Sequence, residues 1–384
     1  MHTETLTPEA AYARAIHRSD MVACKLAFID CKLPGSDKKE NYSLIGAGVT
    51  QSEDQVVNLV EPHGFSLGVA AMPPGVTNNL HMHFTAEVFM VQQGTWKFRW
   101  GHGESQGEVL GGPGDVLSMP TWIFRGFSNV GSDDGWIVTA LGGDNTGGII
   151  WHPEVLAAAA EHGLHLTRDN MLVDVSGGAP RPAPDELTQP LDAEDLSALP
   201  VYTARQMQAF MVRADAREWS DRALVGAVLS SGECALAPAL GYGMSERRGH
   251  VAPITGAHGF SIDWLRLGAA GSTGAFLSRD KQVLCVMRGG LELLINRGPD
   301  QVVVRLEERE VYSVPAHVWR ELRSVGEQAC ELTVTTAGDH RKRLVWAQEV
   351  VDAADARGFT VDPNGCIVQR RLLPLSALDV GVAA

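Results

Sequence analysis

Two histidines and a glutamate lie close together in the sequence at a spacing that suits a metal ion. His81 and His83 are two positions apart, so on a β-strand both imidazoles would point to the same face. A short turn over residues 84–86 then brings Glu87 to the start of the next strand, beside them. Two imidazoles and a carboxylate suit Fe(II), Mn(II), Ni(II) or Zn(II) and leave coordination positions open. The pattern predicts a mononuclear metal site; the alternative is that the three side chains satisfy one another in an apolar interior.

The elements that would position these residues occur twice in the chain. A shift of 195 positions aligns two long stretches without a gap, so that residues 63–66 fall on residues 258–261. In the same register Pro120 falls on Pro315 and Gly163 on Gly358. A constant register from residue 63 to residue 163 indicates an internal duplication.

Each copy consists of short apolar runs that are interrupted by glycine and proline, a texture typical of strands and turns. Apolar residues alternate with charged ones over residues 96–100, which predicts a strand with one buried face. One helix is expected near the end of each copy, over residues 153–163 and 348–358. We expect an all-β fold of two tandem barrels or jelly rolls, each followed by a short helix.

The chain is expected to divide into two domains and a linker. Residues 176–200 contain five prolines and five acidic residues, the composition of an exposed linker. The expected domains are therefore residues 1–175, which carry the metal site, and residues 201–384.

The string from Gly75 to Gly94 resembles the first motif of the cupin superfamily. It reads G-x5-H-x-H-x3-E-x6-G and meets that motif at every defined position. Because the resemblance covers both copies, the chain is similar to bicupins such as gentisate 1,2-dioxygenase, 1-hydroxy-2-naphthoate dioxygenase and quercetin dioxygenase. The resemblance implies two tandem double-stranded β-helix barrels.

The second cupin motif, G-x5-P-x-G-x2-H-x3-N, is matched with two substitutions. Gly114, Pro120 and Asn129 stand at their expected positions. Trp122 replaces a glycine, and Arg125 replaces the histidine that is the fourth ligand in the family. A guanidinium cannot coordinate a cation, so the resemblance implies a site with three protein ligands.

Arg125 is open to three interpretations. It could orient a substrate carboxylate through paired hydrogen bonds, as a catalytic residue. It could pair with Glu87 and replace the charge of the ion, or it could only brace the barrel wall. Arg320 repeats the residue in the second copy, which favours a structural or anion-binding role.

The second copy has lost the three ligands. The positions that lie 195 residues beyond them hold Phe276, Ser278 and Gln282. We therefore expect the second copy to bind no metal and to act as a scaffold or a dimerisation surface.

The resemblance implies a mononuclear non-haem dioxygenase that acts on a small aromatic or enolic acid. In that case His81, His83 and Glu87 would hold Fe(II) as the first choice, with Mn, Ni or Zn as alternatives. The alternative function is a non-catalytic or non-redox cupin: a sensor or binding protein for a small molecule, or an isomerase.

Composition excludes several other classes of function. The 384-residue chain carries a net charge of -14 and no basic stripe, which argues against nucleic acid as a partner. It has no apolar run long enough to span a membrane and no secretory signal pattern at its N-terminus. Its six scattered cysteines are expected to be reduced thiols. We expect a cytoplasmic protein, and a homodimer because barrels commonly cover their edge strands by pairing.

Overall fold

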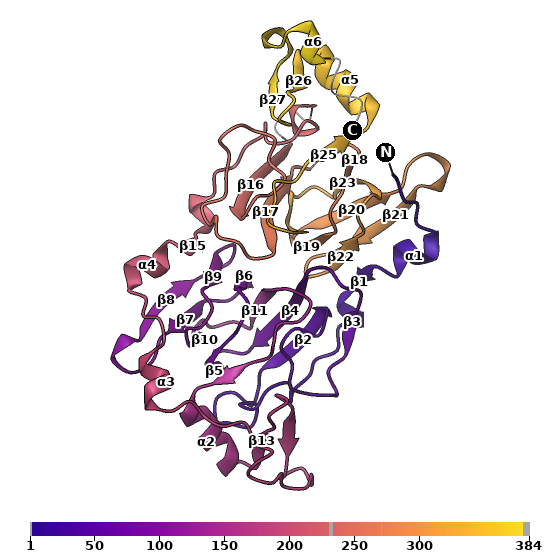
Figure 1. The fold of residues 1–384 in the computed structure, drawn as a ribbon. Coiled ribbons are helices and arrows are strands. Elements are labelled where there is room, and N and C mark those ends of the chain that lie inside the picture. Colours follow the sequence, from indigo (N-terminus) through magenta and orange to yellow (C-terminus); the bar gives the residue numbers. More distant parts are fainter. Residues whose placement is uncertain (1, 230–232, 270, 379–384) are drawn as a thin grey trace. The chain divides into compact units, whose positions relative to one another are not determined.

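The protein is described by a computed structural model, which covers residues 2–229, 233–269 and 271–378 (Figure 1). The chain divides into two compact units. We call Met21–Ala216 the N-terminal unit, and Met1–Asp20 together with Arg217–Ala384 the C-terminal unit. Both units are built mainly of β-strands, as expected.

Two sheets form the N-terminal unit, and all neighbouring strands in them are antiparallel except β2 and β3. The larger sheet has the order β15 (Met211–Val212), β9 (Val116–Met119), β6 (Glu87–Gln93), β11 (Gly135–Gly142), β4 (Phe65–Met72), β2 (Glu40–Ile45), β3 (Val57–Leu59). The smaller sheet has the order β12 (Ile150–Trp151), β5 (Thr77–Met82), β10 (Arg125–Asn129), β7 (Trp96–Trp100), β8 (Gly107–Gly111).

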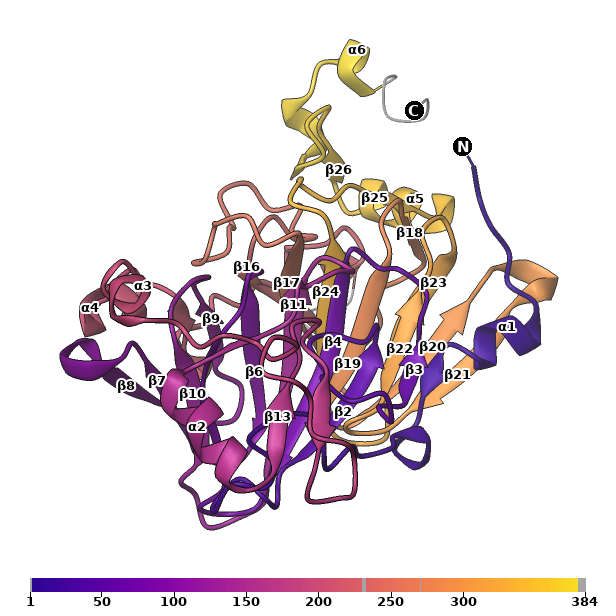
Figure 2. The same ribbon diagram turned by 60° about the horizontal axis from the view of Figure 1, so that its bottom comes forward.

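The C-terminal unit repeats this arrangement (Figure 2). Its larger sheet has the order β1 (Ala15–Ile16), β22 (Val311–Val314), β19 (Gln282–Arg288), β24 (Cys330–Ala337), β17 (Phe260–Leu267), β16 (Cys234–Leu240). Its smaller sheet has the order β21 (Val302–Leu306), β20 (Gly290–Ile295), β23 (Trp319–Val325), β18 (Phe276–Ser278), β25 (Leu344–Trp346).

The strand positions confirm the duplication. β4, β9 and β11 reappear as β17, β22 and β24, each displaced by 195 residues at both ends. The two predicted helices are also confirmed, as α2 (Pro153–Glu161) and α5 (Gln348–Ala356). Each is followed by a glycine in the left-handed conformation, Gly163 or Gly358, which ends the helix and lets the chain turn.

The remaining elements are short. The helices are α1 (Pro8–Tyr12), α3 (Ala193–Ser197), α4 (Ala204–Gln208) and α6 (Leu375–Leu378). Two small hairpins follow the repeated helices: β13 (Leu164–Leu166) with β14 (Leu172–Asp174), and β26 (Phe359–Val361) with β27 (Ile367–Gln369). Single 3-10 turns lie at Arg18–Asp20, Gly103–Ser105, Ala214–Ala216, Ala227–Leu229, Gly298–Asp300 and Arg370–Leu372.

The observed units differ from the boundaries expected at residues 1–175, 176–200 and 201–384. Within the C-terminal unit, β1 pairs with β22 and so holds the first residues of the chain there. Within the N-terminal unit, β15 pairs with β9 and holds residues that precede the second barrel. A strand of two residues has no recognisable sequence pattern. The sequence therefore could not predict that β1 pairs within the C-terminal unit and β15 within the N-terminal unit.

The core of the N-terminal unit lies between its two sheets. Along β7, Trp96, Phe98 and Trp100 are buried and alternate with half-buried Lys97 and Arg99, as the sequence predicted. These aromatic rings pack with residues from both sheets in one apolar cluster. They therefore support the wall behind the candidate site.

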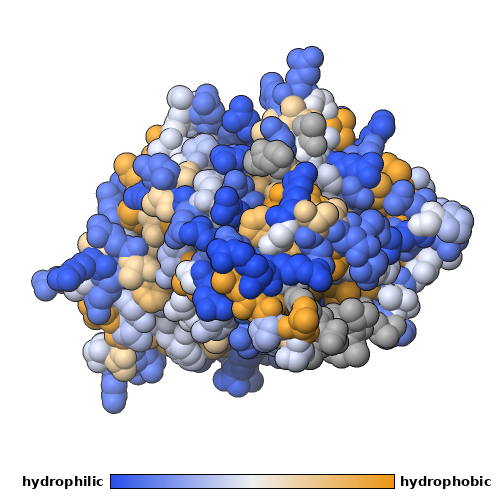
Figure 3. All heavy atoms as spheres, turned by 90° about the horizontal axis from the view of Figure 1, so that it is seen from above, coloured by the Kyte–Doolittle hydropathy of each residue, from blue (hydrophilic) through white to orange (hydrophobic). Residues whose placement is uncertain are grey.

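Polar side chains cover much of one face of the molecule. Figure 3 shows one face of the molecule, on which hydrophilic residues surround smaller hydrophobic areas. Over the part of the chain that the structure describes, no helix is long and apolar enough to cross a membrane.

Candidate metal centre

The three predicted ligands come from neighbouring parts of the N-terminal unit. His81 lies on β5, His83 directly follows that strand, and Glu87 begins β6 after the predicted turn. Backbone pairing places Arg125 of β10 opposite His81 on one side and Trp151 of β12 opposite it on the other. Two sheets thus meet at this point and bring the ligands together.

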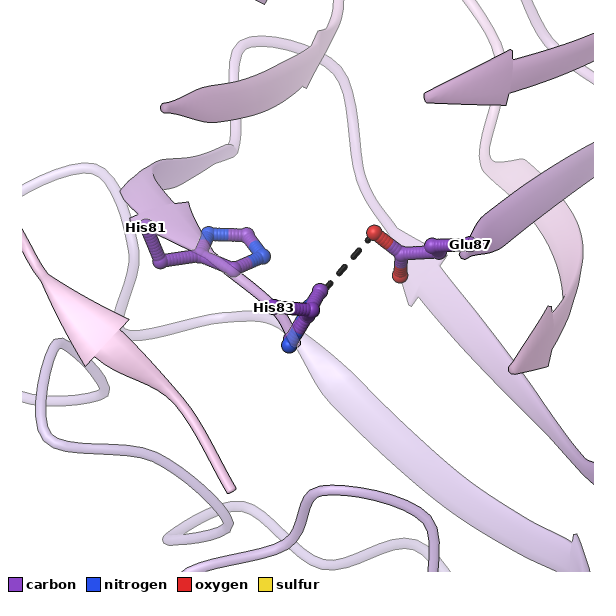
Figure 4. A group of neighbouring side chains, drawn as sticks. All are labelled: His81, His83 and Glu87. Carbon is purple, nitrogen blue, oxygen red and sulfur yellow. Dashed lines mark ion pairs between the residues drawn. The ribbon is translucent and has the colours of Figure 1, made fainter. Parts of the chain in front are cut away.

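Their geometry suits a cation. One potential ligand atom from each of His81, His83 and Glu87 lies within 4.8 Å of the others. The two imidazole rings are 4.8 Å apart between centroids, and His83 Nε2 lies 3.5 Å from a carboxylate oxygen of Glu87 (Figure 4). Three donor atoms this close together could hold one divalent ion between them.

The outer nitrogens of both imidazoles face backbone carbonyl groups. His81 Nδ1 lies 2.7 Å from the carbonyl oxygen of Asn79, and His83 Nδ1 lies 3.5 Å from that of Gly148. A carbonyl only accepts, so these contacts favour the tautomer that carries the proton on Nδ1 and leaves Nε2 free to bind a metal. Ligating histidines are usually oriented in this way. Nε2 of His83 is buried and makes no hydrogen bond within the described chain, which fits a missing ligand partner.

Burial keeps the histidines neutral. The three side chains are at most 5% exposed. Burial lowers the pKa of His81 to about 3 and that of His83 well below its ordinary value. It raises the pKa of Glu87 to about 7, although the positive charge of Arg125 opposes this shift. Neutral imidazoles are the form that binds metals, so these two are ready to coordinate at physiological pH.

A cavity of about 70 Å³ leads to this group. His81, His83 and Glu87 line it together with Phe28 and Trp151, and residues 46–50 form part of its wall. The cavity can therefore admit a few atoms of a small molecule beside the ligands.

Arg125 lies against Glu87 rather than in the open cavity. The side chain is completely buried, and its Nη1 donates to Glu87 Oε2 at 3.3 Å. Its Nη2 donates to the carbonyl oxygen of Pro120 at 2.7 Å. Among the described residues that line the cavity, Arg125 does not occur. These contacts support a structural role of Arg125 in the barrel wall and an ion pair with Glu87. To bind a substrate carboxylate, Arg125 would have to give up one of these hydrogen-bond partners.

The equivalent region of the C-terminal unit is filled. Gln282 replaces Glu87, and its amide donates to the thioether of Met244 at 2.9 Å. Phe276 replaces His81 and packs against Trp346. No second group of metal-binding side chains occurs among the described residues.

Sequence reasoning missed a buried ion pair beside the site. Asp30 and Lys39 are both inaccessible to solvent and are hydrogen-bonded to each other and to residues that precede His81 on β5. Nine residues separate them and they match no motif. The only available signal was the second copy, which has the uncharged residues Gly226 and Cys234 at the corresponding positions.

The fold of two tandem β-barrels agrees with that of solved structures. The chain resembles oxalate decarboxylase of Lactobacillus farciminis in a formate complex, with a TM-score of 0.56, 9% identity, and coverage of 92% of this chain and 91% of that one. It also resembles a mutant of Bacillus subtilis oxalate decarboxylase, with a TM-score of 0.54, 10% identity, and coverage of 90% and 80%. Vicilin from hazelnut (Corylus avellana) has a TM-score of 0.52 at 11% identity, with coverage of 86% and 87%.

At these identities the likeness concerns the fold. No protein-family model matches the sequence, and no curated protein matches it.

Proposed function

We propose that the N-terminal unit is the active site of a metal-dependent enzyme, a mononuclear non-haem dioxygenase that acts on a small aromatic or enolic acid. The observation that carries this proposal is the convergence of His81, His83 and Glu87 in one buried cavity, with the bare Nε2 of His83 directed at Glu87. Burial of two imidazoles and a carboxyl group without a common partner would cost free energy, because their polar atoms lose their contacts with water.

Fe(II) is the proposed ion, with Mn, Ni or Zn as alternatives, because two imidazoles and a carboxylate suit each of them. A bound ion would supply a Lewis acid and, if it is redox-active, a centre for dioxygen chemistry. The protein residues exclude water by burial and hold the imidazoles in the neutral, ligating form. Phe28 and Trp151 offer apolar ring surfaces to a substrate in the cavity.

The size of the cavity favours a small acid. Its volume of about 70 Å³ admits a carboxylate group and few further atoms without a rearrangement of residues 46–50. One similar structure is a formate complex, which supports simple carboxylates as ligands of this fold. We propose that Arg125 stabilises the bound acid through its positive charge.

A second candidate function is supported by the contact between Arg125 and Glu87. Their ion pair of 3.3 Å already supplies a positive charge where the family has its fourth ligand. A protein in which this pair replaces the ion would be a metal-free cupin that binds a small molecule without transforming it.

Oxygen consumption distinguishes the two functions. The purified chain, loaded with Fe(II), is to be tested with gentisate, hydroxynaphthoate, flavonols and small enolic acids, with His81→Ala as the matched control. Uptake by the wild type and none by His81→Ala supports the dioxygenase. Binding of an acid with no uptake, in a chain that purifies without metal, supports the second candidate.

A further inference from the structure

A fully buried ion pair lies behind His81. Lys39 Nζ donates to Asp30, to which it forms a salt bridge, and to Asn78 Oδ1 at 2.7 Å. Both charged side chains are 0% exposed, and the ammonium lies 5.3 Å from the ring centroid of Phe28. A buried pair is weak evidence for stability, because the cost of desolvation can exceed the attraction. Its presence therefore calls for a functional explanation.

The carboxylate of Asp30 is linked to His81 through one residue. Asp30 Oδ2 accepts the backbone N–H of Asn79 at 3.0 Å and its side-chain amide at 3.1 Å. The carbonyl oxygen of Asn79 in turn accepts Nδ1–H of His81 at 2.7 Å. This chain of hydrogen bonds fixes both the carbonyl group and the imidazole that faces it. It leaves Nε2 of His81 as the nitrogen available to a metal.

The second copy has lost both parts of this arrangement. Gly226 and Cys234 occupy the positions of Asp30 and Lys39, since the backbone N–H of Val225 bonds to Glu246 as that of Ile29 bonds to Gln51. Phe276 occupies the position of His81. Both replacements of the charged pair are buried. Two uncharged residues are thus compatible with this fold, so the fold alone does not require the charges.

We propose that the Asp30–Lys39 pair positions His81, with Asp30 as the positioning residue and Lys39 as the cation that holds its carboxylate in place. This inference rests on the proposed metal site. It extends that site by two residues that match no ligand motif.

Two double variants of the full chain test the role of Asp30 without leaving a lone buried charge. Asp30→Asn with Lys39→Met retains an oxygen that can accept the N–H of Asn79. Asp30→Val with Lys39→Met removes it. We expect the valine variant to bind Co(II) about 10–100-fold more weakly than the wild type, the usual effect of losing the partner that orients a ligand. The asparagine variant should stay close to the wild type. The titration is followed by the visible spectrum of Co(II), and the melting temperatures of both apoproteins are recorded.

Equal Co(II) affinities of the two double variants would overturn the inference. If the valine variant does not fold, Asp30→Ala with Lys39→Met takes its place with the same expected loss.

A wild type that binds no Co(II) contradicts the proposed function instead, and the ring nitrogens of His81 then decide the inference separately. Their ¹⁵N chemical shifts in the apoprotein should show the Nδ1–H tautomer in the wild type and the asparagine variant, and a mixture of tautomers in the valine variant. The same tautomer in all three chains would refute the positioning role.

Discussion

Arg125 forms an ion pair with Glu87 in the N-terminal unit, at the position where the cupin motif has a fourth metal ligand. The C-terminal unit has the same contact without the negative charge, because Arg320 donates to Gln282 at 2.7 Å. Arg320 also bonds to the carbonyl oxygen of Pro315 at 3.0 Å, as Arg125 does to that of Pro120. The arginine therefore makes the same backbone contact in both barrels, and among the described residues only the N-terminal unit adds a hydrogen-bonded carboxylate to it.

Replacement of Arg125 should destabilise the apoprotein. Arg125→Ala removes the charge that opposes protonation of Glu87 and leaves this buried carboxyl without its partner, so we expect a loss of up to about 3–5 kcal/mol in the free energy of unfolding at a pH where Glu87 is ionised. Urea denaturation of the metal-free chain measures this change. Combining Arg125→Ala with Glu87→Gln removes the unpaired charge and should recover part of the loss. If the free energy of unfolding of Arg125→Ala stays within about 1 kcal/mol of the wild-type value, which is the range of exposed ion pairs, a structural role of Arg125 is not supported.

A methionine at position 49 should close the cavity. Val49 lines the cavity, and its counterpart in the C-terminal unit is Met244, whose thioether reaches Gln282. Overpacking by Val49→Met should weaken binding of formate to the metal-loaded chain by about 1–3 kcal/mol, which is about 5- to 150-fold. Calorimetric titration provides the measurement. Val60→Met, at a residue that is 79% exposed, serves as the control and should bind formate like the wild type. Unchanged binding by Val49→Met would show that the acid binds elsewhere.

The stability of the C-terminal unit should depend on the pH through Asp263. Burial raises the pKa of this carboxyl to about 7 from 3.8, against the opposing effects of the N–H of Met244 and the charge of Lys342. A raised pKa in the folded state gives a stabilising contribution that is complete below about pH 3.8 and is lost as the pH rises through about 7. Its upper limit is about 4 kcal/mol, since one pKa unit corresponds to about 1.4 kcal/mol.

Asp263→Asn should abolish this contribution. Its melting temperature should fall less than that of the wild type between pH 5 and pH 8, as measured by calorimetry. Glu87 and Glu246 have raised pKa values as well, but they are present in both chains and cancel in the comparison. An exposed control, Asp300→Asn, should follow the wild type. Parallel pH profiles of Asp263→Asn and the wild type would contradict the prediction.

Much of the fold could be predicted because its signals are local or repeated. The alternation along residues 96–100, the turn before Glu87 and the glycines after both repeated helices each determine structure within a few residues. Because the displacement of 195 residues is constant, the strands of the second barrel could be predicted from those of the first. The proximity of His81, His83 and Glu87 could be predicted for the same reason, since their spacing spans a single strand and turn.

The rest depends on contacts between distant parts of the chain. Asp30 and Asn79 are brought together only by the folded barrel, and no spacing in the sequence records their contact. The partner of Arg125 was one of three interpretations, because a sequence does not show in which direction a buried guanidinium points. The placement of β1 in the C-terminal unit and of β15 in the N-terminal unit depends on strand pairings of only two residues each.

The stoichiometry of metal binding tests the central claim most directly. Equilibrium dialysis of the full chain against Co(II) should give one equivalent per chain, since only the N-terminal unit brings His81, His83 and Glu87 together. His81→Ala should bind none at the same concentration, whereas His258→Ala, in the C-terminal unit, should still bind one. Zero or two equivalents in the wild type, or one in His81→Ala, would contradict the account.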